Sequence, residues 1–301
     1  MSVFDQSLES WTVASFESVG DTPCSLDGES ETVFLAEPPT TQFDLHFRII
    51  GFHVRVTPFF WLAAGVLGHS LAVHFSYVLQ DQSPTIGVLL LLWILCVFLS
   101  ILIHELGHAL AMRYYGMNAR IVLWHFGGIA VPESVSSFVG FGARTKPHAQ
   151  ILISAAGPAA QLLLAIVVII GARLGGFRVD TWIDWVNSTF ALTSDNLVDP
   201  SPKVGVLLTF LLLPSISWAL LNLLPIYPLD GGQISREICT LFSMSNGTRI
   251  SLAVSIATAA GVAAYQFQKG FMFNAVMFGM LAYSNYQMLQ NYGRYGGGFG
   301  R

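Results

Sequence analysis

Two histidines and one glutamate stand at metal-binding spacing in the first half of the chain. His104, Glu105 and His108 form the pattern H-E-x-x-H. On an α-helix, residues i and i+4 lie on one face about one turn apart, so both imidazoles can bind the same zinc ion. Glu105 stands beside this pair and can act as the general base toward a water at that ion. The pattern predicts metal-assisted hydrolysis.

The helix that must carry this motif is predicted to cross a membrane. The nineteen residues before His104, from 85 to 103, contain no charged side chain. Glu105 is the only carboxylate well inside any predicted span, and charged groups at such depth are usually functional. A buried ion pair does not explain Glu105, because this span contains no Lys or Arg before Arg113. These surroundings favour a metal site over a structural role.

The composition of the whole chain indicates a membrane protein. Of the 301 residues, 53% are hydrophobic and only 11% are charged, and the mean hydropathy is +0.59. Soluble domains have roughly a quarter charged residues, so these values exclude an ordinary soluble enzyme, a disordered protein and a secreted disulfide scaffold. The net charge of −4 gives no basis for nucleic-acid binding. The three cysteines are far apart and predict neither disulfides nor a cysteine zinc site.

Apolar runs predict an all-α polytopic membrane protein with about six transmembrane helices. Two short strands over residues 43–56, hinged near Gly51, are expected before the first helix, and a re-entrant or edge β segment after the second. The last span is the weakest, because Asn274, Ser284 and Asn285 interrupt it. The predicted spans are residues 57–80, 85–113, 149–172, 204–226, 249–267 and 271–288.

The sequence divides into three parts. Residues 1–44 carry nine acidic residues and no Lys or Arg, which predicts a mostly disordered N-terminal tail. Residues 45–289 form the membrane domain, and residues 290–301 are expected to be a flexible glycine-rich tail. With six spans and the N-terminus inside, ten of the 14 basic residues lie on the inner side. We therefore expect both termini in the cytoplasm and the protein in the cell (inner) membrane.

A third metal ligand is expected near the end of the fourth span, because catalytic zinc generally takes three protein ligands. Asp230 follows Pro225 and Pro228, which break the helix there. A single aspartate at the end of a span is usually only an interfacial residue. In the predicted topology, however, the second and fourth spans run in the same direction. A chain that turns back toward the membrane after Pro225 would bring Asp230 to the depth of His104.

The two motifs together resemble the site-2 protease family of intramembrane zinc metalloproteases. HELGH at 104–108 and NLLPIYPLDGG at 222–232 carry the resemblance, with weaker support from FGG at 126–128 and SAAGP at 154–158. It covers most of residues 45–290. The resemblance implies an intramembrane metalloprotease domain with one zinc ion per chain.

The resemblance also assigns roles to individual residues. It implies that His104, His108 and Asp230 bind the zinc ion, while Glu105 activates water. It implies further that Asn222 contacts the substrate or polarises the scissile carbonyl.

The chain departs from the family pattern in two respects. Three residues after Pro158, where the family often has asparagine, this chain has Gln161. No segment is long enough to hold a PDZ domain or a pair of CBS domains. We therefore expect a minimal form of the family.

His69, His74 and His125 are three further histidines with a candidate role. His69 and His74 could line a water path or respond to pH, but five residues apart they do not share a helical face well, which favours a structural role. His125, in LWHFGGIAVP, either shapes the substrate channel or is interfacial. The backbone of that segment could pair with an unwound substrate as an added strand.

The implied function is hydrolysis of peptide bonds within or near transmembrane helices of other membrane proteins, either to release a signalling domain or to clear membrane remnants. The expected partners are these substrates and the lipid bilayer, without nucleic acid. Two alternatives stay open. A membrane metal-ion transporter needs ligands along its whole path, whereas the outer halves of spans two to four are almost entirely apolar. A catalytically silent relative that binds membrane helices has little reason to keep Glu105.

Overall fold

Long apolar helices and one small sheet make up most of the described chain. The computed structural model describes residues 39–80, 83–124, 127–132, 146–194, 196–244 and 246–295. These residues belong to one unit, Glu37–Arg301. His125 and the predicted tail residues 1–38 and 296–301 lie outside the described residues.

The predicted transmembrane helices are present, which confirms the all-α polytopic fold class. The sixth predicted span is also a helix, α8 (Met272–Tyr295), and it continues past residue 290, where the sequence predicts the tail to begin. By length and composition, five helices of the described ranges suit a membrane crossing, and α8 is not among them. These five are α1 (Pro58–Leu79), α2 (Ile86–Tyr114), α3 (Pro147–Leu174), α5 (Pro202–Asn222) and α7 (Gly247–Gln268).

The fourth span ends earlier than the sequence predicts. α5 stops at Asn222 rather than near residue 226, because Pro225 lacks a backbone N–H and its ring clashes with a continuing helix. Turns over residues 223–229 lead into α6 (Asp230–Phe242), a helix that the sequence analysis misses. A second missed helix, α4 (Asp184–Thr189), lies between α3 and α5.

A four-stranded sheet joins the two predicted β segments in the order β1-β2-β3-β4. β1 (Leu45–Ile49) and β2 (Phe52–Val56) form the expected antiparallel hairpin, with Gly51 at a φ of 86° in its turn. β3 (Ala119–Trp124) and β4 (Gly127–Pro132) form a second antiparallel pair. The edge β segment expected after the second span is therefore confirmed, and β4 is an outer strand.

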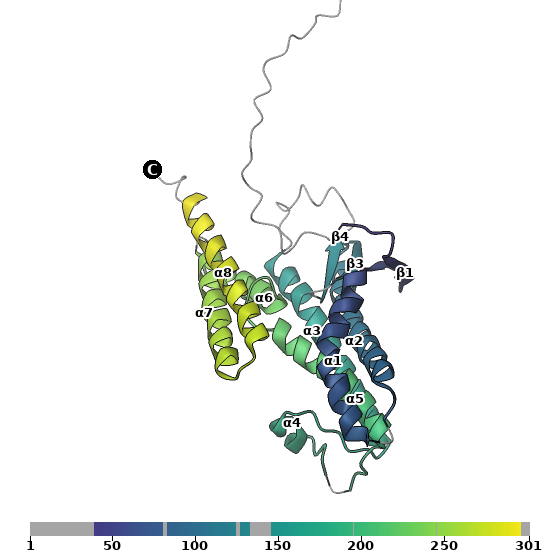
Figure 1. Cartoon of the computed structure of the whole chain (residues 1–301). Coiled ribbons are helices and arrows are strands. Elements are labelled where there is room, and N and C mark those ends of the chain that lie inside the picture. The colour runs from purple at the N-terminus through teal and green to yellow at the C-terminus, as the bar shows by residue number, and fades with distance from the viewer. Residues whose placement is uncertain are drawn as a thin grey trace, which may run out of the picture. The chain divides into compact units, whose positions relative to one another are not determined.

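β2 and β3 are parallel neighbours although α1 and α2 separate them in the sequence. Figure 1 shows the strands β1, β3 and β4 together at one end of α1 and α2. β2 leads into α1 and β3 follows α2, and the pairing brings the start of α1 beside the end of β3. The N–H of Thr57 adds to this connection by donating to the carbonyl oxygen of Leu123 over 2.9 Å. β4 contacts α2. The sheet therefore holds an edge strand against the helix that carries the H-E-x-x-H motif.

Close packing of α2 against α3 depends on Gly107 of the motif. A Cβ atom at this residue would lie 2.4 Å from the carbonyl oxygen of Ala156 and 2.8 Å from Cβ of Ala160. α2 is also bound to α1, because Nε1 of Trp93 donates to the carbonyl oxygen of Ala64 over 3.0 Å. The motif helix is therefore fixed between two other helices.

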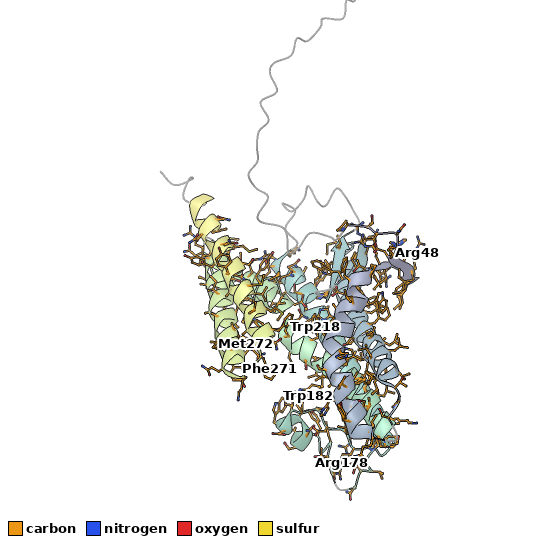
Figure 2. The ribbon with its side chains drawn as sticks, viewed as in Figure 1. Arg48, Arg178, Trp182, Trp218, Phe271 and Met272 are labelled. Carbon is orange, nitrogen blue, oxygen red and sulfur yellow. The ribbon has the colours of Figure 1, made fainter. Side chains whose placement is uncertain are left out.

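Apolar side chains also cover much of the outside of the helices. Many leucine, isoleucine and valine side chains of α1, α2 and α3 are exposed. Trp182 and Phe271 in loops and Met272 at the start of α8 are exposed as well (Figure 2). Apolar surface of this extent is expected where side chains face lipid rather than water.

Candidate metal and catalytic site

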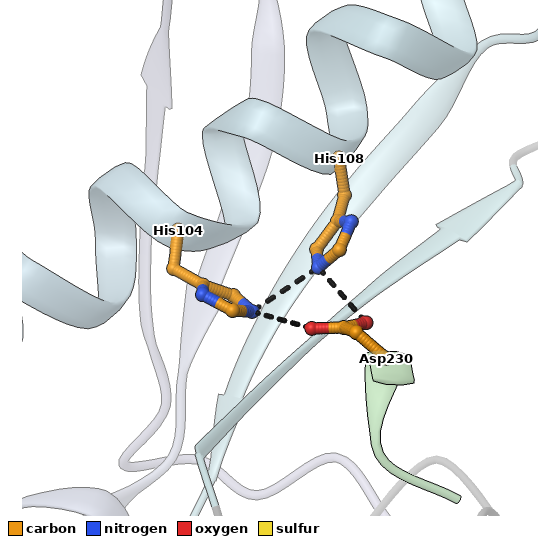
Figure 3. Close-up of side chains that lie close together, drawn as sticks. All are labelled: His104, His108 and Asp230. Atoms are coloured by element: carbon orange, nitrogen blue, oxygen red, sulfur yellow. Dashed lines mark hydrogen bonds and ion pairs between the residues drawn. The ribbon is translucent and has the colours of Figure 1, made fainter. Parts of the chain in front are cut away.

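The three predicted metal ligands meet in one group (Figure 3). His104 and His108 come from α2, and Asp230 is the first residue of α6. Nε2 of His104 lies 3.2 Å from Oδ2 of Asp230, and Nε2 of His108 lies 3.3 Å from Oδ1. The two Nε2 atoms are 3.1 Å apart. All three residues are largely buried.

Both imidazoles are anchored through Nδ1. In His108 this atom lies 2.8 Å from the carbonyl oxygen of Ile153, and in His104 it lies 3.0 Å from Oε1 of Gln161. A carbonyl oxygen can only accept a hydrogen bond, so His108 carries a proton on Nδ1, and Nε2 is the ring nitrogen left to bind a metal. His104 presents Nε2 toward the same point.

This donor set fits a zinc ion. Two imidazole nitrogens and a carboxylate converge, and each can give a lone pair to a metal ion once it carries no proton. Oδ2 of Asp230 is buried and accepts no hydrogen bond from the residues that the structure describes. Ligand atoms of a tetrahedral zinc ion lie roughly 3.3–3.6 Å apart, close to the distances of 3.1, 3.2 and 3.3 Å found here.

Strand β4 holds Glu105 beside the ligand group. The backbone N–H of Ala130 donates a hydrogen bond to the Glu105 carboxyl group. Gly128 is so close that a Cβ atom there would lie 2.3 Å from Cγ of Glu105. Glu105 is only 4% exposed. A fixed carboxyl group next to a metal site is well placed to exchange protons with a water.

Gly157 on α3 leaves the space that His108 occupies. A Cβ atom at this residue would lie 2.2 Å from Nε2 of His108. The same helix supplies Ile153 and Gln161, whose oxygens face the two histidines. The glycine of the SAAGP pattern is therefore required for a steric reason, because it leaves room for the imidazole of His108.

Helices α7 and α8 hold the loop that precedes Asp230. The N–H of Tyr227 donates to Oγ of Ser255 on α7 over 3.1 Å. The carbonyl oxygen of Tyr227 accepts from Nδ2 of Asn285 on α8 over 2.6 Å. Both side chains are almost completely buried. Side chains of α7 and α8 thus form hydrogen bonds with both backbone polar groups of Tyr227, three residues before Asp230.

Asn222 is buried at the end of α5, but the structure does not bring it into the ligand group. Its Nδ2 donates to the carbonyl oxygen of Trp218 over 3.1 Å. Within the described residues it forms no hydrogen bond with Glu105 or with the three metal ligands. His69 and His74 are exposed on α1 and also stand outside the group.

The sequence analysis assigns no supporting role to three polar residues that the structure places at the site: Gln161, Ser255 and Asn285. Gln161 contacts a metal ligand directly, and the other two contact the loop before Asp230. In the sequence analysis, Asn285 serves only as evidence that weakens the prediction of the sixth transmembrane helix. Burial of polar groups in apolar helices is expensive, and these positions inside predicted spans are the feature that could have identified them.

A family model described as Peptidase family M50 matches residues 92–263, more than half of the chain. Both motifs lie inside the match. Among solved structures, the site-2 protease from Methanocaldococcus jannaschii is 20% identical, with a TM-score of 0.46; the match covers 82% of this chain and 95% of that chain.

Curated zinc metalloproteases are also similar. A protein named as a zinc metalloprotease in Synechocystis sp. is 28% identical over 192 residues, which are 63% of this chain and 42% of that protein. A zinc metalloprotease of Methanocaldococcus jannaschii is 23% identical over 184 residues, 58% of this chain and 43% of that protein. The chain thus spans about two fifths of the length of these relatives.

Proposed function

Because this chain belongs to peptidase family M50, we propose that it is an intramembrane zinc metalloprotease that cleaves other membrane proteins within or near their transmembrane helices. One observation supports this most directly. His104, His108 and Asp230 form a buried ligand group, and Glu105 lies beside it. Three of these four residues belong to an apolar helix that is long enough to cross a membrane.

In the proposed mechanism, the ligand group and Glu105 divide the chemistry. His104, His108 and Asp230 would hold one zinc ion, which when bound lowers the pKa of a water toward about 7 and polarises the scissile carbonyl. Glu105 takes a proton from the attacking water and afterwards delivers it to the leaving amine. The N–H of Ala130 keeps the Glu105 carboxyl group in position for both transfers.

Asn222 is the proposed partner of the substrate carbonyl. It is buried at the end of α5, and one hydrogen of its side-chain NH₂ group is donated to Trp218. The second hydrogen remains available for a carbonyl oxygen that gains negative charge during the attack. Asn222 would then act on the substrate without contacting the metal ligands.

The outer edge of β4 is the proposed binding surface for the substrate backbone. Within the described sheet, β4 pairs with β3 alone, and its residues Gly128 and Ala130 contact Glu105. A peptide added as a strand along β4 would therefore pass beside the general base. A transmembrane helix hides its amides in its own hydrogen bonds and must unwind first. We therefore expect helix-weakening residues near the cleaved bond.

The proposed setting is a bilayer with both termini of the chain on the cytoplasmic side. The excess of basic residues on that side supports this orientation. Water would then reach the ligand group from the cytoplasm. Cleavage in this position suits either release of a signalling domain or removal of membrane remnants.

The test is cleavage of a panel of single-span membrane proteins by the purified full chain in detergent. Glu105→Gln keeps the side-chain shape but removes the proton acceptor. Glu237→Gln, the same exchange on α6 at a residue that pairs with Arg236, is the control. We expect Glu105→Gln to lower cleavage by about 10²- to 10⁴-fold while zinc stays bound, and Glu237→Gln to cleave like wild type.

Other results would contradict the proposal. Unchanged cleavage by Glu105→Gln would remove Glu105 from the mechanism. Absence of zinc from the purified wild type would contradict the metal site itself. Bound zinc with no cleavage of the panel, combined with zinc uptake into vesicles, would favour the transporter instead.

A further inference from the structure

We propose that Gln161 is a positioning residue that fixes the proton of His104 on Nδ1, so that Nε2 can bind the metal. Gln161 would do so as the last member of a hydrogen-bond chain, the tautomer relay, which runs from the carbonyl oxygen of Leu211 through Ser215 and Ser100. The inference rests on the proposed zinc function. It concerns the proton on one imidazole, however, and can be tested separately from proteolysis.

The direction of the first hydrogen bond in the relay is fixed by its acceptor. Oγ of Ser215 lies 2.6 Å from the carbonyl oxygen of Leu211, about one turn earlier in α5. A carbonyl oxygen only accepts, so the hydroxyl hydrogen of Ser215 points to Leu211. Ser215 can then offer only lone pairs to Ser100 on α2, whose Oγ lies 3.0 Å away. Ser100 is therefore the donor in that pair.

Ser100 in turn orients the carboxamide of Gln161. Its hydrogen is already donated, so it can only accept, and Nε2 of Gln161 lies 2.7 Å from its Oγ. The carbonyl oxygen of Pro214, another group that only accepts, lies 3.4 Å from the same Nε2. Both neighbours require the NH₂ end of the carboxamide at this place. The opposite end, Oε1, must therefore face His104.

The orientation of Gln161 determines the tautomer of His104. Oε1 lies 3.0 Å from Nδ1 of His104 and can only accept, so Nδ1 carries the proton. Nε2 is then the ring nitrogen left for the metal, and it lies 3.2 Å from Oδ2 of Asp230. The other tautomer would place a hydrogen on Nε2, where a metal ligand needs a lone pair.

Burial protects this arrangement. Ser100, Gln161 and Ser215 are 0% exposed, and His104 is 3% exposed. If the hydrogen bonds of the relay ran in the opposite direction, some of these groups would lack a partner, and water could not easily reach them to replace it. The three relay side chains come from α2, α3 and α5, so packing of these helices sets the proton position in the site.

The two histidines differ in what holds them. Nδ1 of His108 faces the main-chain carbonyl oxygen of Ile153, which no side-chain substitution removes. Nδ1 of His104 faces a side chain. Side-chain substitutions should therefore disturb the tautomer of His104 and leave that of His108 unchanged.

Four variants of the full chain test the relay. Gln161→Met keeps the length of the side chain without donor or acceptor. Gln161→Glu keeps an acceptor for Nδ1, as in carboxylate–histidine–zinc sites. Ser215→Ala removes the first member of the relay. Thr209→Val is its control, because it removes a comparable bond on α5, from Thr209 to the carbonyl oxygen of Gly205.

The first measurement is zinc affinity, by competition with a chelator in detergent. We expect Gln161→Met to weaken zinc binding by about 10- to 100-fold and Gln161→Glu to stay close to wild type. Ser215→Ala should bind zinc more weakly than Thr209→Val, which should match wild type. Wild-type affinity in Gln161→Met, or an equal loss in Gln161→Met and Gln161→Glu, would overturn the inference.

The second measurement is the ¹⁵N spectrum of histidine-labelled, metal-free protein, with His104 identified through His104→Ala. We expect a protonated Nδ1 in wild type and a mixture of tautomers in Gln161→Met. A wild-type His104 with no proton on Nδ1 would overturn the inference. If Gln161→Met does not fold, Ser215→Ala and Thr209→Val decide by the same two measurements, and equal behaviour of these two would count against the relay.

Neither measurement depends on cleavage. If the tautomer and the zinc affinities behave as expected but no substrate is cut, the proposed function fails and the relay stands. If cleavage is found but His104 has the other tautomer, the relay fails and the proposed function stands.

Discussion

Gly128 of β4 lies directly against the carboxyl group of Glu105. A Cβ atom at residue 128 would come within 2.3 Å of Cγ and 2.6 Å of Oε1 of Glu105. Real Cβ atoms essentially never approach other atoms so closely, so no larger residue fits without moving the carboxyl group. The sheet therefore determines where the proposed general base stands, although Glu105 belongs to a helix.

Gly128→Ala should separate proton transfer from metal binding. The added methyl group displaces the Glu105 carboxyl group, since the three atoms nearest to it all belong to Glu105. We expect cleavage to fall by about 10²-fold or more, with zinc content unchanged, measured on the same preparation. Gly87→Ala on α2, where a Cβ atom meets nothing within 4 Å, is the control. Full activity in Gly128→Ala would contradict this placement of Glu105.

Gly157→Ala should have the converse effect. Its Cβ atom would lie 2.2 Å from Nε2 of His108, so the imidazole must leave the ligand group. We expect zinc affinity to fall by about 10- to 100-fold, and cleavage to fall with it at limiting zinc. Chelator competition measures this, with Gly171→Ala on the same helix, in open space, as the control. Equal affinity of both variants would rule out the steric explanation.

Removal of the metal should abolish cleavage in a way that added zinc reverses. Removal of the carboxylate ligand Asp230 should abolish cleavage in a way that added zinc does not reverse. A strong chelator should inactivate the wild type, and added zinc should restore it. Asp230→Ala leaves only His104 and His108 and should bind little zinc at any practical concentration. Asp199→Ala is the control, since Asp199 is exposed and pairs with Arg178. Zinc bound equally by both variants would exclude Asp230 as a ligand.

Asn285→Leu should weaken both the fold and the metal site. The change leaves the carbonyl oxygen of Tyr227 without the donor that now lies 2.6 Å away. An unsatisfied buried group of this kind destabilises a protein by about 1–3 kcal/mol. We expect a lower Tm in detergent and weaker zinc binding. Asn274→Leu, the same exchange on the same helix, should change neither, and matching losses in both would mean that any polar residue of α8 is equivalent.

The spans and the first β hairpin are readable from sequence because each depends on local composition. A run of apolar residues long enough to cross a bilayer predicts α2 from the sequence of that segment alone. The same holds for the H-E-x-x-H motif, since the spacing of His104 and His108 alone places them on one helical face.

The remaining features depend on contacts between distant segments. Nothing near β2 or β3 in the sequence shows that they pair in parallel, and that pairing is part of what brings Gly128 to Glu105. Asn285 looks like a defect in the sixth span until Tyr227 is seen beside it. The roles of His104, Glu105, His108 and Asp230 stay predictions, because the structure gives only the positions of these side chains. Measurements of zinc binding and cleavage are needed to assign their roles.

The hydrogen bonds from α7 and α8 to Tyr227 also have a consequence for biosynthesis. Chains are made and inserted from the N-terminus, so His104 and His108 enter the membrane well before Ser255 and Asn285 exist. The loop that presents the aspartate gains its full support only when α8 is in place. We therefore expect the proposed metal site to stay incomplete in a nascent chain until α8 has been inserted.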